Sequence, residues 1–189
     1  MMEIAAPLSH LATGLWLLGA LGFTGFSVWL SALDIATRRL PNRIAGWGIV
    51  ATLGPLVASC LVRLPVDRAG ALGDLADALG GAALLFIVFA ILWRVSPSGV
   101  GGGDVKIAPI AGGALGFFAG WWAVWIGALA ACAIAAVWGA ILARRARSTG
   151  AGTGARSAGT VPFAVCLFAG AWVVLFGGLL LALIGAARG

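Results

Sequence analysis

Long apolar segments alternate with short polar ones along the whole of this 189-residue chain. Charge-free apolar segments run over Leu8–Leu33, Ile44–Val62, Ala78–Trp93, Ile107–Phe118, Ala119–Ala143 and Val161–Ala187. A helix needs about 20 mostly apolar residues to cross a bilayer. The pattern therefore predicts an all-α, polytopic membrane protein: a bundle of about six transmembrane helices that forms a single domain over residues 1–189.

The fourth apolar segment is the shortest, and only the stretch Gly116–Trp122 separates its body from that of the fifth. A single helix over residues 107–143 would be about 55 Å long, against about 30 Å for the hydrocarbon core of a bilayer. The tryptophans of this stretch favour a membrane interface. We therefore expect two helices that are joined by a tight turn.

Composition supports the membrane assignment and excludes other classes. With 62% hydrophobic and 10% charged residues, the chain has more apolar surface than a soluble domain of this size can bury. Its net charge of +6 would suggest nucleic acid in a soluble protein, but here we assign the basic residues to membrane topology and expect lipid contacts and no nucleic-acid partner. Cys60, Cys132 and Cys166 lie far apart in apolar segments, and the whole chain has a single histidine. No metal site and no cofactor is therefore expected.

The distribution of Lys and Arg predicts the orientation. With the N-terminus outside, nine basic residues face the cytoplasm, namely Arg38, Arg39, Arg43, Arg94, Lys106, Arg144, Arg145, Arg147 and Arg156. Three face outward, namely Arg63, Arg68 and Arg188. The positive-inside rule then favours the cell inner membrane and an even number of spans, with an outer loop over Arg63–Gly73 and a cytoplasmic linker over 144–159.

Orientation also separates the six acidic residues. Glu3, Asp67, Asp74 and Asp77 fall outside, whereas Asp34 and Asp104 fall inside. Asp104 can be explained as a helix N-cap, and Asp34 as a surface partner of Arg38. However, a carboxylate at a helix C-terminus opposes the macrodipole, which makes Asp34 unusual in its position.

Two carboxyls on one membrane face supply a definite chemistry. Acidic residues near the bilayer are costly and prompt a functional hypothesis. Two neighbouring carboxyls share a proton, so one activates water while the other polarises a peptide carbonyl, as in an aspartyl peptidase. The glycines before Asp104 would let a backbone approach closely and adopt positive φ angles. Lys106 is explained more simply as an inner topological charge than as a catalytic group.

Two motifs resemble those of a known family. Asp34 lies in Ser-Ala-Leu-Asp-Ile-Ala-Thr-Arg-Arg-Leu-Pro-Asn, and Asp104 lies in Gly-Gly-Gly-Asp-Val-Lys. Together they resemble the type IV prepilin peptidases, which are GxGD aspartyl proteases, and Val-Pro-Phe at 161–163 resembles the start of that family's last helix. The resemblance implies that Asp34 and Asp104 are the catalytic pair. It also implies a supporting motif of Gly101, Gly103, Lys106, Arg38, Arg39, Pro41 and Asn42.

The chain lacks the cysteine-containing cytoplasmic region of the larger, methylating prepilin peptidases. It is therefore similar to the short, peptidase-only branch associated with Tad/Flp pili (CpaA/TadV-like). The resemblance implies cleavage of the leader from a prepilin or pseudopilin, whose apolar helix lies against the bundle, without N-methylation. The signal peptidases of archaeal flagella stay open as a near relative. Alternatives from other classes are a small ion- or proton-coupled permease and a catalytically inert pilus-assembly subunit.

Overall fold

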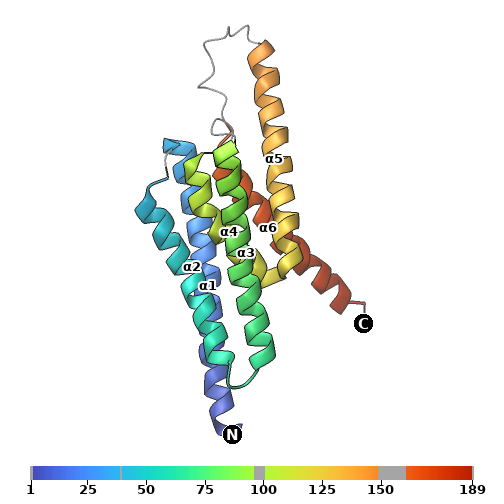
Figure 1. Ribbon diagram of the computed structural model, residues 1–189. Coiled ribbons are helices and arrows are strands. Elements are labelled where there is room, and N and C mark those ends of the chain that lie inside the picture. Colours follow the sequence, from blue (N-terminus) through green and yellow to red (C-terminus); the bar gives the residue numbers. More distant parts are fainter. Residues whose placement is uncertain (1, 39, 96–100, 149–160, 189) are drawn as a thin grey trace.

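The protein is a bundle of antiparallel helices (Figure 1). The computed structural model describes residues 2–38, 40–95, 101–148 and 161–188, and every regular element in these ranges is an α-helix. The helices are α1 (Met2–Thr37), α2 (Asn42–Arg63), α3 (Arg68–Val95), α4 (Gly102–Ala119), α5 (Trp121–Ser148) and α6 (Phe163–Ala186). The predicted all-α, six-helix membrane fold is confirmed.

Five of these helices, α1, α2, α3, α5 and α6, contain a segment that is long and apolar enough to cross a bilayer. The protein is therefore a multi-pass membrane protein. The exception is α4, which at 18 residues is the shortest helix and has Asp104 and Lys106 near its start. At 1.5 Å per residue it is about 27 Å long.

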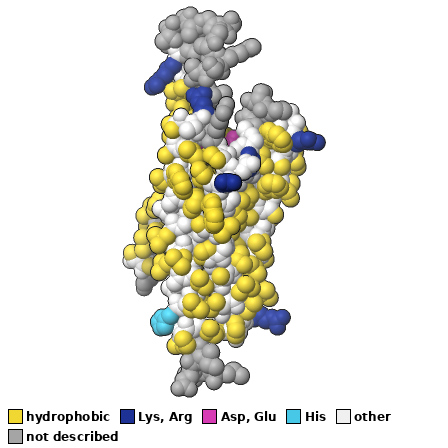
Figure 2. All heavy atoms as spheres, turned by 90° about the vertical axis from the view of Figure 1, so that its left-hand side faces the viewer, with side chains coloured by type: hydrophobic (Ala, Val, Ile, Leu, Met, Phe, Trp, Pro, Cys, Tyr) yellow, Lys and Arg dark blue, Asp and Glu magenta, His cyan; other side chains and the backbone are white. Residues whose placement is uncertain are grey.

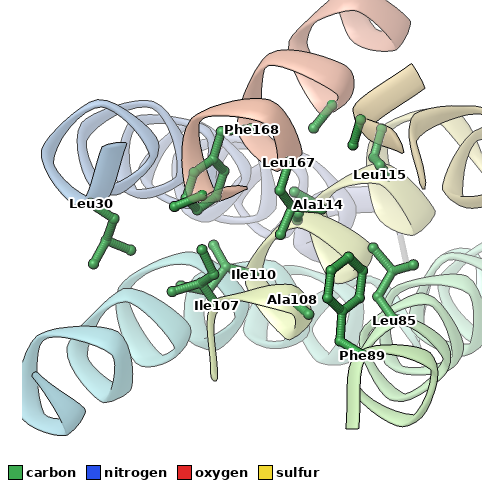
Figure 3. Close-up of a cluster of buried hydrophobic side chains, with 14 of the residues drawn as sticks. Leu30, Leu85, Phe89, Ile107, Ala108, Ile110, Ala114, Leu115, Leu167 and Phe168 are labelled. Carbon is green, nitrogen blue, oxygen red and sulfur yellow. The ribbon is translucent and has the colours of Figure 1, made fainter. Parts of the chain in front are cut away.

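Helix α4 lies at the centre of the bundle, which explains its composition. Twelve of its 18 residues are buried. Figure 3 shows Ile107, Ile110 and Ala114 of α4 among side chains from α1, α3 and α6, such as Leu30 and Phe168. A helix that is covered by protein does not need a lipid-facing apolar surface all round, so its charged first turn is compatible with this position.

Small residues bring α4 into direct backbone contact with α3. A Cβ added to Gly112 would collide with the carbonyl of Gly81, and a Cβ on Gly116 would collide with the carbonyl of Asp77. Gly112 and Gly116 have the Gly-x-x-x-Gly spacing that lets membrane helices approach closely. The axial position of α4 is thus fixed against α3.

The turn between α4 and α5 lies at a single glycine. Gly120 has φ +80° and ψ 177°, a conformation that residues with a side chain rarely adopt. Its N–H donates to the carbonyl of Gly116 at 2.9 Å and ends α4. This glycine is the physical reason why residues 107–143 form two helices instead of one.

The outer loop is shorter than the sequence suggested. We expected it to extend from Arg63 to Gly73, but α3 already begins at Arg68. The guanidinium of Arg63 pairs with Asp74 at 2.5 Å and with Asp67 at 3.0 Å. Asp67 caps the start of α3, because its Oδ1 accepts the N–H of Gly70 at 3.0 Å, so the expected loop end at Gly73 was wrong.

Candidate active site

Both inner aspartates are buried at the same end of the bundle. Asp34 is 9% and Asp104 7% exposed. The last turn of α1 carries Asp34, and the first turn of α4 carries Asp104. The N-terminus of α6 lies at this end too (Figure 1). In Figure 2 an acidic side chain shows in a recess at the end of the molecule where most basic side chains gather.

Asp34 caps a helix other than its own. Its Oδ2 accepts a hydrogen bond from the backbone N–H of Ala164 at 3.2 Å, although the two residues are 130 positions apart. Ala164 is the second residue of α6, and its N–H is one of the groups that a helix leaves without an internal acceptor. The unfavourable position of Asp34 at the end of α1 is thus compensated by the positive end of the α6 dipole.

Asp104 lies in the first turn of α4. Its Oδ2 accepts the N–H of Gly101 at 2.9 Å, and its own N–H donates to the carbonyl of Gly101 at 3.0 Å. The cap residue of α4 is therefore Gly101, not Asp104, which corrects the N-cap interpretation. The carboxylate closes the turn from inside the helix, as the acidic residue of a capping box does.

The surroundings of Asp104 favour its protonated form. Asp104 lies outside the five apolar segments, and burial raises the pKa of its carboxyl from 3.8 to about 6. The hydrogen bond from Gly101 acts in the opposite direction, and the negative charge of Asp34 raises the pKa of Asp104 further. The two carboxyls are therefore close enough to interact electrostatically, as a pair that shares a proton must be.

The glycines before Asp104 permit close packing. Gly101 has φ −75°, so the positive φ angles expected of these glycines are not found at this residue. A Cβ on Gly103 would lie 3.1 Å from Leu40 Cδ1, and one on Gly102 would lie 3.6 Å from Trp93 Nε1. The first turn of α4 is thus enclosed between the α1–α2 connection and the end of α3.

The remaining motif residues shape the connection between α1 and α2. Arg38 has φ +51° and its N–H donates to the Asp34 carbonyl at 2.9 Å, which ends α1. The carbonyl of Pro41, the cap residue of α2, accepts the N–H groups of Ile44 and Ala45, whereas Asn42 is exposed at the first helical position. These residues place the buried Leu40 against Gly103.

The two remaining motif residues are Arg39 and Lys106. Arg39 lies outside the described residues. Lys106 is exposed, although Asp104 and Ile107 on either side of it are buried. Its position fits the interpretation as a topological charge.

The site can perform acid–base chemistry with two carboxyls and neighbouring backbone N–H groups. Across the described ranges, no three His, Cys, Asp or Glu side chains lie together so that they could hold a metal ion. Sequence reasoning missed the backbone N–H of Ala164 and, farther along the contact between α1 and α6, the side chains of Ser27 and Trp172. The signal for Ser27 was present, because it precedes Asp34 by seven residues and hence lies on the same face of α1.

Comparison with known proteins agrees with the geometry. A model of the type IV leader peptidase family matches residues 21–142, a range that includes both Asp34 and Asp104. Searches of curated proteins and of solved structures gave no significant match. The family match covers more than half of the chain, and the protein therefore belongs to the type IV leader peptidase family.

Proposed function

We propose that this protein is a membrane aspartic endopeptidase that removes the leader peptide from Tad/Flp-type prepilins or pseudopilins at the cytoplasmic face of the inner membrane. Asp34 and Asp104 are its catalytic pair. The observation that carries the proposal is the burial of these two carboxyls at one end of the bundle, within electrostatic reach of each other. Membership of the family supports a peptidase acting on leader sequences.

The environments of the two carboxyls suggest separate roles. Asp104, with a pKa of about 6, is the proton donor that polarises the peptide carbonyl. Asp34, which faces the N–H of Ala164 and the positive end of α6, is the ionised base. Asp34 takes a proton from water, and the water oxygen bonds to the carbonyl carbon. The C–N bond then breaks as the leaving nitrogen gains a proton, giving one carboxyl and one amine product.

The position of the site fits a substrate with an apolar helix and a polar leader. A substrate helix that lies in the bilayer beside the bundle would bring the peptide bond beyond its end to the level of Asp34 and Asp104. An ion-coupled permease would instead place its carboxylates near the midplane, often at interrupted helices. Both aspartates here lie in terminal turns of their helices, which favours the peptidase.

The connections of the bundle support cleavage without methylation. Helices α1 and α2 are joined on the proposed cytoplasmic side by only residues 38–41. The three cysteines lie apart in α2, α5 and α6, so they do not form the paired cysteines of the larger enzymes. We therefore expect the mature pilin to carry an unmodified N-terminus.

The test is a cleavage assay with protein and prepilin reconstituted together in lipid vesicles. We expect Asp34→Asn and Asp104→Asn each to lower the cleavage rate by about 10³-fold or more, since each removes a proton-transfer group. Asp77→Asn, at the opposite end of the bundle, is the matched control and should cleave at the wild-type rate. Mass spectrometry of the product reports the cleaved bond and any added methyl group.

The same assay distinguishes the proposed function from its alternatives. Wild-type rates in either site variant, with the protein still inserted, would disprove the catalytic pair. Absence of cleavage by the wild type towards every prepilin tested would indicate the inert assembly subunit. A methylated product would contradict the peptidase-only assignment.

A further inference from the structure

The face of α1 that carries Asp34 is continuous with a contact seam against α6. Phe23, Ser27, Leu30 and Asp34 follow one another at intervals of four, three and four residues, and all four are buried. This spacing puts them on one face of a helix. Three of them contact α6 directly, because Phe23 meets Phe168 and Trp172, Ser27 meets Trp172, and Asp34 meets Ala164.

Two polar contacts tie this seam together. Trp172 Nε1 donates to the Ser27 hydroxyl oxygen at 3.1 Å, and the N–H of Ala164 donates to Asp34 at 3.2 Å. Ser27 and Asp34 are seven residues apart on α1, about 10 Å, and Ala164 and Trp172 are eight apart on α6, about 12 Å. The two contacts are therefore spaced almost equally along the two antiparallel helices, so both form at one axial alignment of α1 with α6.

The Ser27 hydroxyl has a fixed orientation. It donates its hydrogen to the carbonyl of Thr24 at 2.9 Å, so a lone pair is left to accept the indole N–H of Trp172. Ser27 is 1% exposed, so its hydroxyl lies in the interior of the bundle. The indole ring is held by Phe23, at a centroid distance of 5.1 Å, and by stacking on Phe176 at 5.0 Å.

We propose that the Ser27–Trp172 hydrogen bond is a positioning device for catalysis: it sets the axial register of α1 against α6 and thereby holds the Asp34 carboxyl at the N-terminus of α6. This inference rests on the proposed role of Asp34 as a catalytic base. Ser27 and Trp172 are positioning residues, because they touch neither substrate nor the carboxyls. Without the bond, α1 slides or rotates on α6, and Asp34 loses its alignment with Asp104. A displacement of about 1 Å at a reacting group lowers a rate by up to about 100-fold.

The test measures kcat and KM of the full-length protein in vesicles for Ser27→Ala, Ser27→Thr, Trp172→Phe and the Ser27→Ala/Trp172→Phe double variant. We expect Ser27→Ala and Trp172→Phe each to lower kcat about 10-fold with KM changed less than about twofold. Ser27→Thr keeps the hydroxyl and restores kcat. The double variant is no slower than the single ones, because both remove the same bond.

The two control variants change a hydroxyl residue and a tryptophan elsewhere on α1 and leave the Ser27–Trp172 hydrogen bond intact. Thr24→Val removes an exposed hydroxyl of α1 that bonds to the carbonyl of Ala20, and Trp16→Phe alters a tryptophan that contacts Phe118 edge-on. Both should retain wild-type kcat. Rates are normalised to protein that stays folded and monodisperse, so a loss of folding does not count as a loss of kcat.

The proposal is overturned if Ser27→Ala or Trp172→Phe keeps kcat within about twofold of wild type. It is also overturned if Ser27→Thr is as slow as Ser27→Ala, or if the double variant is slower by the product of the single effects. Asp34→Asn in the same assay separates the two hypotheses. Activity in Asp34→Asn disproves the proposed function, whereas its inactivity together with full activity of Ser27→Ala disproves only the positioning role.

Discussion

At the scale of single residues, each aspartate of the site accepts a hydrogen bond from a backbone N–H at a helix N-terminus. Asp34 accepts the N–H of Ala164 and Asp104 that of Gly101, so backbone donors and helix dipoles offset part of the cost of burying two carboxyls. For Asp104 the offset is incomplete, because burial still raises its pKa to about 6. Burial of a carboxyl with a raised pKa lowers the stability of the folded protein at neutral pH, a cost that the proposed catalytic role would explain.

This cost predicts a pH-dependent difference between wild type and Asp104→Asn. The folded protein binds the Asp104 proton more tightly than the unfolded chain, so its free energy of unfolding decreases as pH rises from about 4 to about 6. Asn cannot ionise. At pH 7.5 we expect Asp104→Asn to be more stable than wild type by about 1–3 kcal/mol, and at pH 4 to be equal. Thermal unfolding of purified protein in detergent at both pH values measures this.

The pKa of the Asp67 carboxyl is shifted in the opposite direction to that of Asp104, which makes Asp67 a useful comparison. The N–H of Gly70 and the guanidinium of Arg63 lower the pKa of the Asp67 carboxyl. Its contribution to stability is therefore present above its ordinary pKa and is lost as pH falls through the lowered value. Asp67→Asn should be less stable than wild type at pH 7.5, with a difference that disappears in acid. If Asp104→Asn behaved in the same way, burial would not be the dominant effect at Asp104.

At the scale of elements, the position of Asp104 depends on how closely α4 approaches α3. Gly112 of α4 meets the Gly81 carbonyl of α3, and no space remains for a Cβ. We expect Gly112→Ala to cost about 1–3 kcal/mol of stability and to lower kcat, because α4 must shift and carries Asp104 with it. Thermal unfolding and the prepilin assay test both effects.

Gly54→Ala is the matched control for this prediction. Gly54 lies within α2, and a Cβ there has no neighbour within 4 Å. Alanine at such a helical position gains up to about 1 kcal/mol over glycine, so this variant should be as stable as wild type or more stable. If Gly112→Ala were as stable as Gly54→Ala, helix propensity, and not the contact with α3, would decide the result.

Local sequence patterns predicted most of the elements but not the partners of Asp34. Apolar segments located the helices, because each helix shows its composition within about 20 residues. The start of α3 was missed, because the capping role of Asp67, which accepts the N–H of Gly70, was not recognised. Asp34 appeared unfavourable because its compensating donor, Ala164, lies 130 residues away in sequence. Interactions of this range leave no local periodicity, so only the fold reveals them.

At the scale of the whole molecule, charge divides the two ends of the bundle. Among the described side chains, the end with the two buried carboxyls carries Arg38, Arg43, Arg94, Lys106, Arg144 and Arg145 against Asp34 and Asp104. The opposite end carries Arg63, Arg68 and Arg188 against Asp67, Asp74 and Asp77. Figure 2 shows a broad apolar band between the ends. This asymmetry supports the proposal that the end with Asp34 and Asp104 faces the cytoplasm.

Single-cysteine labelling in intact cells tests this orientation and the crossing of α4 together. The variants are Arg43→Cys at the start of α2, Arg144→Cys near the end of α5 and Arg68→Cys at the start of α3, in a background without the native cysteines. A membrane-impermeant maleimide should label Arg68→Cys from outside, and should label Arg43→Cys and Arg144→Cys only after permeabilisation. Helices α2, α3 and α5 are long and apolar enough to cross, so residues 43 and 144 share a side if α4 crosses as well and lie on opposite sides if it does not. Labelling of Arg144→Cys from outside, with residue 43 still protected, would therefore show that α4 does not span the bilayer. Labelling of Arg43→Cys from outside would instead show that the protein has the opposite orientation. The carboxyl pair would then lie where a cytoplasmic leader could not reach it.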